Sequence, residues 1–305
     1  MGVVSVAVVT DSTAYLPAGT AEKRGIRVVP LEVRLGDRVG REGVDVTTAE
    51  LCAALVDRRV EVQTSRPAPR EFAEVYRDAL GSGADAVVSV HLSRELSGTW
   101  DAARLAAEEV GPDRVRVVDS RSTAMGLGYA VLAAADAADA GADPAAVERA
   151  AASVAARCRT YFCVENLDRL RHGGRIGTAA ALLGTALAVK PLLHVTNGRI
   201  VLLEKVRTTA RAVQRLVDLA ASAAGDRPAD LAVHHLGAAE RAAELAERLR
   251  TRVRCVRQLL VSEVGAVIGA HAGIGLLGIV VVPAEDQQLA RRRPDGRTGS
   301  AASPE

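Results

Sequence analysis

Valine-rich runs recur along the first half of the chain, and several of them are apolar at almost every position. The runs are VVSVAVVT (residues 3–10), IRVVPLEVR (26–34), ADAVVSVHLS (84–93) and RVRVVDS (114–120). Strands that are apolar on both faces are typical of a parallel sheet that helices cover on both sides. The runs therefore predict a parallel sheet flanked by helices in the first half of an α/β protein.

Helical patterns separate the later runs, and their ends carry local signals. TTAE, at Thr47 to Glu50, has the spacing of a capping box, and Pro67 follows a Thr-Ser pair ahead of a helix predicted over about 67–80. A second helix is predicted from the pattern TWDAARLAAEEV (99–110). Residues 125–158 are predicted to form two helices, broken near AGADP, that join two domains.

The second half predicts another α/β domain. YFCVENLDRLRHGGRIG reads as a strand followed by a glycine-rich loop, and Asn197-Gly198 lies between two apolar runs, which is a strong hairpin signal. We therefore expect an N-terminal domain over 1–158 and a C-terminal α/β domain with a mixed sheet over 159–283. Residues 284–305 are polar without periodicity and are expected to be a disordered tail.

Composition narrows the classes of function. The chain has 305 residues, enough for two cores, and 39 Lys plus Arg nearly balance 37 Asp plus Glu. This balance, with only 2% aromatic residues, argues against a nucleic-acid-binding module. The four cysteines form no CxxC pair and the N-terminus lacks the features of a signal peptide, so a cytoplasmic protein is expected.

One apolar stretch raises the question of a membrane span. LLVSEVGAVIGAHAGIGLLGIVVV (259–282) is long enough, but it contains Glu263, His271 and five glycines. These residues favour a buried helix followed by a strand over exposure to lipid. No stable membrane insertion is expected.

Hydroxyl-bearing residues follow several of the predicted strands. The segments are DSTAY (11–15), TSRP (64–67), LSRELSGT (92–99) and DSRSTAMG (119–126). Loops at the carboxyl ends of parallel strands gather on one edge of the sheet, where ligands bind. Together these hydroxyl-bearing segments predict a site for a small anion such as a carboxylate or phosphate, although each Ser or Thr could instead cap its own helix. Asp11 and Asp119 are expected to brace these loops rather than to bind a metal.

Three residues of the second half are candidates for the same site. His271 lies in GAHAGIG, whose small neighbours permit close approach of a ligand, though a hydrogen-bonded core histidine fits too. Arg207 lies where a strand gives way to a helix, so it could hold an oxyanion or be a surface charge. Arg175, in HGGRIG, is predicted to be solvated or to contact a partner. GxSxG, GxGxxG and Walker A motifs are missing from the sequence.

Nine short motifs stand in the order that is found in the DegV family. They are VVTDSTAYLP, TSRP, LSRELSGTW, VVDSRSTAMGLGY, LDRLRHGGRI, LAVKPLL, NGRI, KVRT and GAHAGIG, and they span about residues 4–283. The chain thus resembles a family that includes the fatty-acid-binding subunits of bacterial fatty acid kinases. The resemblance implies a two-domain α/β fold that holds one long-chain fatty acid in an apolar tunnel, with no cofactor or metal. A separate ATP-dependent kinase subunit would convert the carboxylate to an acyl phosphate.

The resemblance also implies roles for single residues. Thr64, Ser97 and His271 would bind the carboxylate. Ser65, Gly98 and Arg207 would support the anion site, and Arg175 would lie on the kinase-docking face. TAAALLGTALAVKPLL (178–193), which is aliphatic on every face, would line the tunnel or be a buried helix. Arg66, Arg94 and Ile274 depart from the residues usual in the family.

Two functions are compatible with these residues. The first is a lipid carrier that binds a fatty acid, presents it to a kinase and does no chemistry of its own. Each buried CH₂ contributes about 0.8 kcal/mol and each neutral hydrogen bond about 1 kcal/mol, so the tail would supply affinity and the head group orientation. The alternative is an enzyme for a small phosphorylated or carboxylated metabolite, with His271 as acid or base.

Overall fold

A four-stranded parallel sheet forms the centre of the first half. The computed structural model describes residues 4–57, 59–176 and 189–285. The strands are β1 (Val6–Asp11), β2 (Arg27–Val29), β6 (Ala86–His91) and β7 (Val115–Asp119). Their order is β2-β1-β6-β7, and every neighbouring pair is parallel. The predicted parallel sheet is confirmed.

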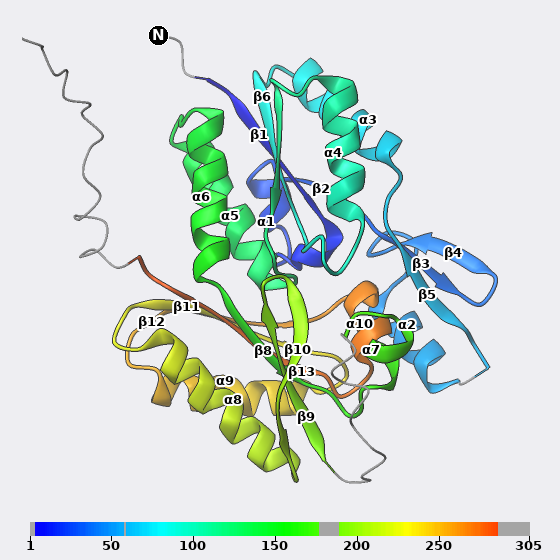
Figure 1. Ribbon diagram of the computed structural model, residues 1–305, viewed down its shortest axis with the longest axis vertical. Coiled ribbons are helices and arrows are strands. Elements are labelled where there is room, and N and C mark those ends of the chain that lie inside the picture. Colours follow the sequence, from blue (N-terminus) through cyan, green and yellow to red (C-terminus); the bar gives the residue numbers. More distant parts are fainter. Residues whose placement is uncertain (1–3, 58, 177–188, 286–305) are drawn as a thin grey trace, which may run out of the picture.

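Helices cover both faces of this sheet (Figure 1). They are α3 (Pro69–Gly81) and α4 (Thr99–Val110) on one face, and α5 (Met125–Asp139) and α6 (Pro144–Arg157) on the other; η1 (Ser12–Ala14) and α1 (Thr20–Lys23) follow β1. Val8 packs against α5 and α6, whereas its neighbour Val9 packs against α3 and α4. Successive side chains of a strand point to opposite faces, which is why the strands are apolar throughout.

The second half is built on a six-stranded mixed sheet. Its order is β10-β9-β8-β13-β11-β12, and of these neighbours β11 and β12 are parallel while the other pairs are antiparallel. The strands are β8 (Arg159–Cys163), β9 (Lys190–Thr196), β10 (Arg199–Val206), β11 (Ala229–His235), β12 (Val256–Glu263) and β13 (Leu277–Pro283). Helices α8 (Thr209–Ala224) and α9 (Ala239–Arg252) cover one face. Asn197 and Gly198 form the predicted hairpin turn, with φ of 49° and 80°.

A small antiparallel sheet was not predicted. It consists of β4 (Arg38–Arg41), β3 (Glu32–Leu35) and β5 (Val62–Ser65), with α2 (Thr48–Val56) beside it. The run 26–34 was expected to be one strand, but it divides at Pro30 into β2 and β3. Proline has no N–H to donate, so the chain leaves the parallel sheet there. Helix α2 does begin with the predicted capping box between Thr47 and Glu50.

The small sheet connects the two halves. It packs against α10 (Ala266–Ala272), which also contacts α2 and α7 (Asp168–His172). Leu31, Val33 and Leu51 share one apolar core with Phe162 and Leu193. The chain passes from α6 to β8 at Cys158, near the predicted domain boundary, yet residues 31–55 contribute to the core of the second half.

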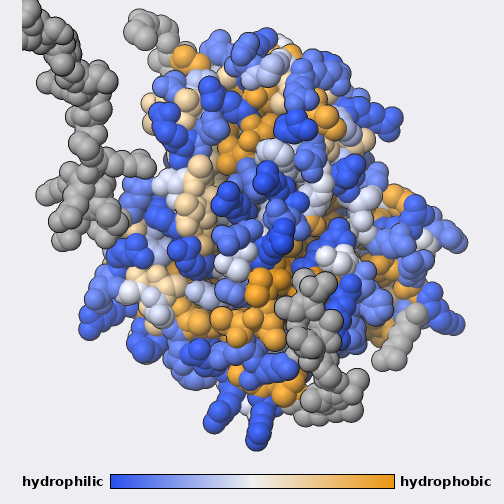
Figure 2. Space-filling view, in the orientation of Figure 1, coloured by the Kyte–Doolittle hydropathy of each residue, from blue (hydrophilic) through white to orange (hydrophobic). Residues whose placement is uncertain are grey.

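The apolar stretch 259–282 folds into the end of β12, the short helix α10, and β13. Within the described parts of the chain, no helix has the length and apolar character needed to cross a membrane. Hydrophilic residues cover most of the face seen in Figure 2, with hydrophobic residues showing in smaller areas between them. The predicted tail lies outside the described residues from position 286 onward.

Candidate ligand cavity between the two sheets

A cavity lies where the carboxyl ends of the parallel strands face the six-stranded sheet. It encloses about 940 Å³ of space, counting its opening to solvent. Most of the wall is aliphatic, with contributions from both halves of the chain. The apolar lining residues are Leu31, Leu92, Leu96, Ala124, Phe162, Leu170, Val195, Ile200, Val264, Val267, Ile268, Ala272, Leu276, Ile279 and Val280. The wall therefore suits a ligand that is largely hydrocarbon.

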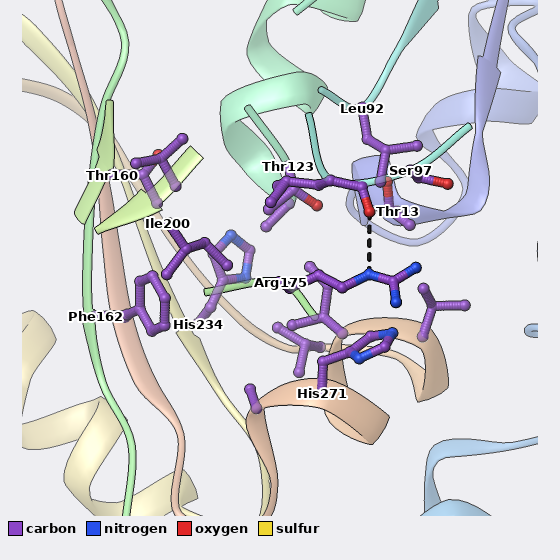
Figure 3. Close-up of a pocket in the computed structure, with 18 of the residues that line it drawn as sticks. Thr13, Leu92, Ser97, Thr123, Thr160, Phe162, Arg175, Ile200, His234 and His271 are labelled. Atoms are coloured by element: carbon purple, nitrogen blue, oxygen red, sulfur yellow. Dashed lines mark hydrogen bonds between the residues drawn. The ribbon is translucent and has the colours of Figure 1, made fainter. Parts of the chain in front are cut away.

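Polar groups gather at one end of the cavity. Figure 3 shows Ser97, Arg175 and His271 on one side of the view, and Thr160, Phe162 and Ile200 on the other. Thr64 on β5 shares a hydrogen bond of 2.8 Å between its Oγ1 and Nε2 of His271 on α10. The structure thus brings Thr64, Ser97 and His271, the three predicted carboxylate ligands, to a single cavity.

Burial keeps the imidazole of His271 uncharged at neutral pH. Desolvation, assisted by the positive charge of Arg175, lowers the pKa of His271 to about 4. The ring lies over Gly173, where a Cβ would come within 2.4 Å of Nδ1 of His271. Glycine in HGGRIG therefore permits the imidazole to approach the backbone, and the neutral ring can donate or accept a hydrogen bond.

Arg175 lies in a different environment from the one we expected. Its position in a glycine-rich loop indicated a solvated side chain, but the guanidinium is half-buried and lines the cavity. Nε donates to the backbone oxygen of Leu96 at 3.1 Å, drawn as a dashed line in Figure 3, and Nη1 donates to the oxygen of Gly173. Burial lowers the pKa of Arg175. The docking role stays a prediction, and the side chain faces the ligand space.

The other residues predicted for the anion site differ in whether they lie at the cavity. Ser65 lines the mouth of the cavity and donates to Glu32 at 2.8 Å. Gly98 directly precedes α4, and a Cβ there would lie 2.5 Å from Nη1 of Arg66, so the arginine passes close over the backbone. Arg207 is exposed and is not part of the described cavity wall. It follows β10, an edge strand of the six-stranded sheet, so the structure does not bring Arg207 to the site.

The hydroxyls of LSRELSGT have separate roles. Ser93 donates to the backbone oxygen of Gly198 at 2.8 Å and so joins the first half to the β9–β10 hairpin. Ser97 Oγ accepts from the N–H of Thr99 at 3.3 Å and shares a 2.8 Å hydrogen bond with its hydroxyl. Of these three, Ser97 belongs to the cavity wall. Helix α4 has no side-chain cap, and Ser97 lies on the cavity wall, where its predicted role in the anion site stays a prediction.

Asp11 braces the first corner, as predicted. Its carboxylate accepts from the N–H of Thr13 and of Leu92, and from Nδ1 of His91, each at 3.0 Å. His91 Nε2 in turn lies 2.6 Å from Ser89 Oγ. The order Ser-His-Asp matches that of a hydrolase triad, but these three residues are fully buried and lie outside the described cavity wall. They are structural, since a nucleophile must reach its substrate.

The sequence pattern did not indicate His234 as a residue of the site. It lines the cavity, with Nε2 accepting from the N–H of Met125 at 3.2 Å and Nδ1 lying 3.0 Å from Ser262 Oγ. Burial lowers its pKa to about 4. His234 stands in a strand pattern, LAVHHLG, that does not show which histidine faces the ligand space. The proposed tunnel segment 178–193 lies outside the described residues up to position 188.

No group of three or more His, Cys, Asp or Glu side chains able to hold a metal ion occurs in the described ranges. The fold and the cavity define an α/β protein with an apolar ligand space between two sheets and a polar end to that space. A family profile described as "Uncharacterised protein, DegV family" matches residues 5–284. The chain belongs to the DegV family.

Relatives match over nearly their whole length. A DegV domain-containing protein of Streptomyces coelicolor is 58% identical over 276 residues, which cover 90% of this chain and 98% of that protein. Among solved structures, a fatty-acid-binding DegV family protein of Thermus thermophilus is similar with a TM-score of 0.87 and 34% identity, covering 92% of this chain and 100% of its own. DegV of Bacillus subtilis, described as a fatty acid binding protein, has a TM-score of 0.83, 34% identity and the same coverage. The two-domain α/β fold is confirmed.

Proposed function

We propose that this protein binds one long-chain fatty acid, with the acyl chain in the apolar cavity and the carboxylate at Thr64, Ser97 and His271. The observation that carries the proposal is the form of the cavity, which is aliphatic along most of its wall and has Thr64, Ser97 and His271 together at one end. Similar structures from Thermus thermophilus and Bacillus subtilis are described as fatty acid binding, which supports it.

The tail supplies most of the affinity in this proposal. At about 0.8 kcal/mol per buried CH₂, a chain of about fourteen methylenes contributes on the order of 10 kcal/mol before the costs of binding. Each neutral hydrogen bond to the head group contributes about 1 kcal/mol. The polar end therefore fixes the orientation of the acid, with its carboxyl group near Ser65 and Arg66, two exposed residues of the cavity wall.

We further propose that the protein is a carrier and not an enzyme, and that it presents the carboxylate to an ATP-dependent kinase subunit for acyl phosphate formation. A pKa of about 4 makes His271 a poor general base at neutral pH, which supports the carrier over the alternative of a metabolite enzyme. A cytoplasmic location is part of this proposal. All four cysteines are unpaired, as expected of a reducing compartment.

Mass spectrometry tests the ligand directly. The protein, purified from a bacterial host, is denatured and the released small molecules are identified, with one long-chain fatty acid per chain as the expected result. Thr64→Val keeps the size of the side chain but removes the hydroxyl that pairs with His271, so we expect the Kd for the fatty acid to rise about five- to tenfold.

Thr251→Val, on the exposed side of α9, is the matched control and should leave the Kd unchanged. Absence of any extracted fatty acid, together with a melting temperature indifferent to added oleate or palmitate, would contradict the carrier proposal. The enzyme for a small carboxylated or phosphorylated metabolite would then be the better hypothesis.

A further inference from the structure

The cavity wall carries more positive charge than a carboxylate can neutralise. Its described residues include two arginines, Arg66 and Arg175, and neither an Asp nor a Glu. The two histidines of the wall, His234 and His271, are uncharged at neutral pH because burial lowers the pKa of each to about 4. The wall therefore carries two positive charges, and one carboxylate would leave one of them unmatched.

Neither arginine has an acidic partner among the described residues. Arg175 donates to the backbone oxygens of Leu96 and Gly173, which are neutral acceptors. Arg66 is exposed at the mouth and forms no ion pair with any residue in the described ranges. Glu32 is close in the fold, since it accepts a hydrogen bond from Ser65, but it does not line the described wall.

The position of Arg66 directs its charge to the head-group end. Its Nη1 lies 2.5 Å from where a Cβ on Gly98 would stand, so the guanidinium crosses the backbone next to Ser97. Ser97 and Thr64 are the hydroxyls of the same end of the cavity. A planar guanidinium suits a phosphoryl group well, because its donors can pair with two oxygens at once.

We propose that Arg66, with Ser97 and Arg175, forms a phosphoryl subsite, so that the cavity prefers a single-chain lipid with a doubly charged phosphoryl head group over the carboxylate of the same length. A phosphate monoester carries about −1.5 to −2 charge at pH 7 and offers three acceptor oxygens. Arg66 is the residue that determines this specificity. The inference rests on the proposed function, because the same apolar space must hold the chain.

Competition binding tests the preference. Displacement of a fluorescent fatty acid by hexadecanoate and by hexadecyl phosphate is measured on delipidated protein at pH 8 and low salt. Hexadecyl phosphate should bind roughly tenfold more tightly than hexadecanoate, since one more charge pair forms at a partly solvated site. Arg66→Gln should weaken the binding of hexadecyl phosphate more than that of hexadecanoate, and so reduce the preference to about twofold.

Arg70→Gln is the matched control. Arg70 is also exposed, lies four residues along the chain on α3, and lines no part of the described wall, so its loss of charge should not change the preference. Inorganic phosphate, which lacks the chain, should displace neither lipid at the same concentration. At pH 5 the preference should largely disappear, because a phosphate monoester takes up its second proton near pH 6 while Arg66 and Arg175 stay charged and the imidazole of His271 stays neutral.

The outcomes separate the two proposals. Equal affinity for the two lipids in the unmodified protein, or an unchanged preference in Arg66→Gln, overturns the phosphoryl subsite and leaves fatty acid binding intact. Binding of hexadecyl phosphate without binding of hexadecanoate overturns the proposed fatty acid ligand and keeps the subsite. A protein that binds neither lipid overturns both.

Discussion

His234 and His271 line the cavity wall, and burial keeps both imidazole rings uncharged at neutral pH. Each one is held by hydrogen bonds that a neutral ring can make: His234 with Met125 and Ser262, and His271 with Thr64. Protonation of either ring would place a charge in an apolar wall, and for His271 that charge would lie near the positive charge of Arg175. At the residue scale the polar end of the cavity thus depends on neutral donors and acceptors, with arginine as the source of charge.

The buried histidines make stability depend on pH. Their folded pKa of about 4 is below the ordinary value of 6.5, so between these values the unfolded chain binds more protons. Stability is fully present above pH 6.5 and is lost as pH falls toward 4. Between pH 7 and pH 5, we expect each ring to lower the free energy of unfolding by up to about 2 kcal/mol.

Urea unfolding at several pH values measures this dependence. His271→Gln should reduce the pH dependence of the free energy of unfolding by the contribution of one ring. His172→Gln, at an exposed position of α7, should leave that dependence unchanged. Equal slopes for the His271 variant and the unmodified protein would show that His271 is not buried as a neutral ring.

Helix α10, which carries His271, is held at its N-terminus by Glu42, the residue that follows β4 of the small sheet. The carboxylate of Glu42 accepts from the N–H of Val267 at 2.7 Å and from the hydroxyl of Tyr15 at 2.9 Å, and Ser12 donates to its other oxygen. Gly265 permits this approach, since a Cβ there would lie 2.4 Å from Glu42 Oε1. A seven-residue helix is marginal alone, so at the element scale this buried carboxylate orients His271, which lines the cavity.

Glu42→Ala should therefore affect both stability and binding. Three donors, one buried and two half-buried, lose their acceptor, so we expect a loss of about 2–3 kcal/mol in the free energy of unfolding. We also expect weaker fatty acid binding, because α10 no longer directs His271 toward Thr64. Urea unfolding and ligand titration measure the two effects.

Glu50→Ala is the matched control for this variant. It removes the capping box of α2, worth about 1 kcal/mol, without touching the N-terminus of α10. Its fatty acid affinity should match that of the unmodified protein. If the two variants bind the ligand equally well, Glu42 contributes to stability alone.

The two halves of the molecule meet around the cavity. Helix α5 of the first half packs on the six-stranded sheet, where Tyr129 donates to the backbone oxygen of Leu231 at 2.7 Å. Ser93 contacts the turn at Gly198, and the small sheet packs against α10. At the scale of the whole molecule, a ligand in the cavity contacts both sheets at once and should stabilise them as one unit.

Fatty acid loading should raise the stability of both halves together. At a free ligand concentration of 100 times Kd, the expected gain is about 2.7 kcal/mol. Hydrogen exchange should show increased protection in β5 and in α10, and thermal melts should shift as one transition. Butyrate, which has the head group without the long chain, is the control and should give no shift. Protection confined to one half would indicate that the ligand does not bridge the two sheets.

Local signals in the sequence were enough to predict many of the turns and helix ends. The turn at Asn197 and Gly198, the capping box at Thr47, and the break before Pro144 each depend on residues that are adjacent in the chain. Such preferences act within one turn of backbone, so the sequence displays them. The run 26–34 was misjudged, because an apolar strand pattern does not say which sheet a strand joins after a proline.

The sequence by itself determined the α/β class with a parallel and a mixed sheet, and Thr64, Ser97 and His271 as candidates, through local patterns and a family resemblance. Tertiary structure alone decided that Thr64 and His271, 207 positions apart, share a hydrogen bond, that Arg175 faces the ligand space, and that Arg207 does not. The physical reason is that a sequence motif reflects interactions between residues that are close together in the chain. The distance between two motifs is fixed by the packing of α10 and the small sheet, to which many distant residues contribute.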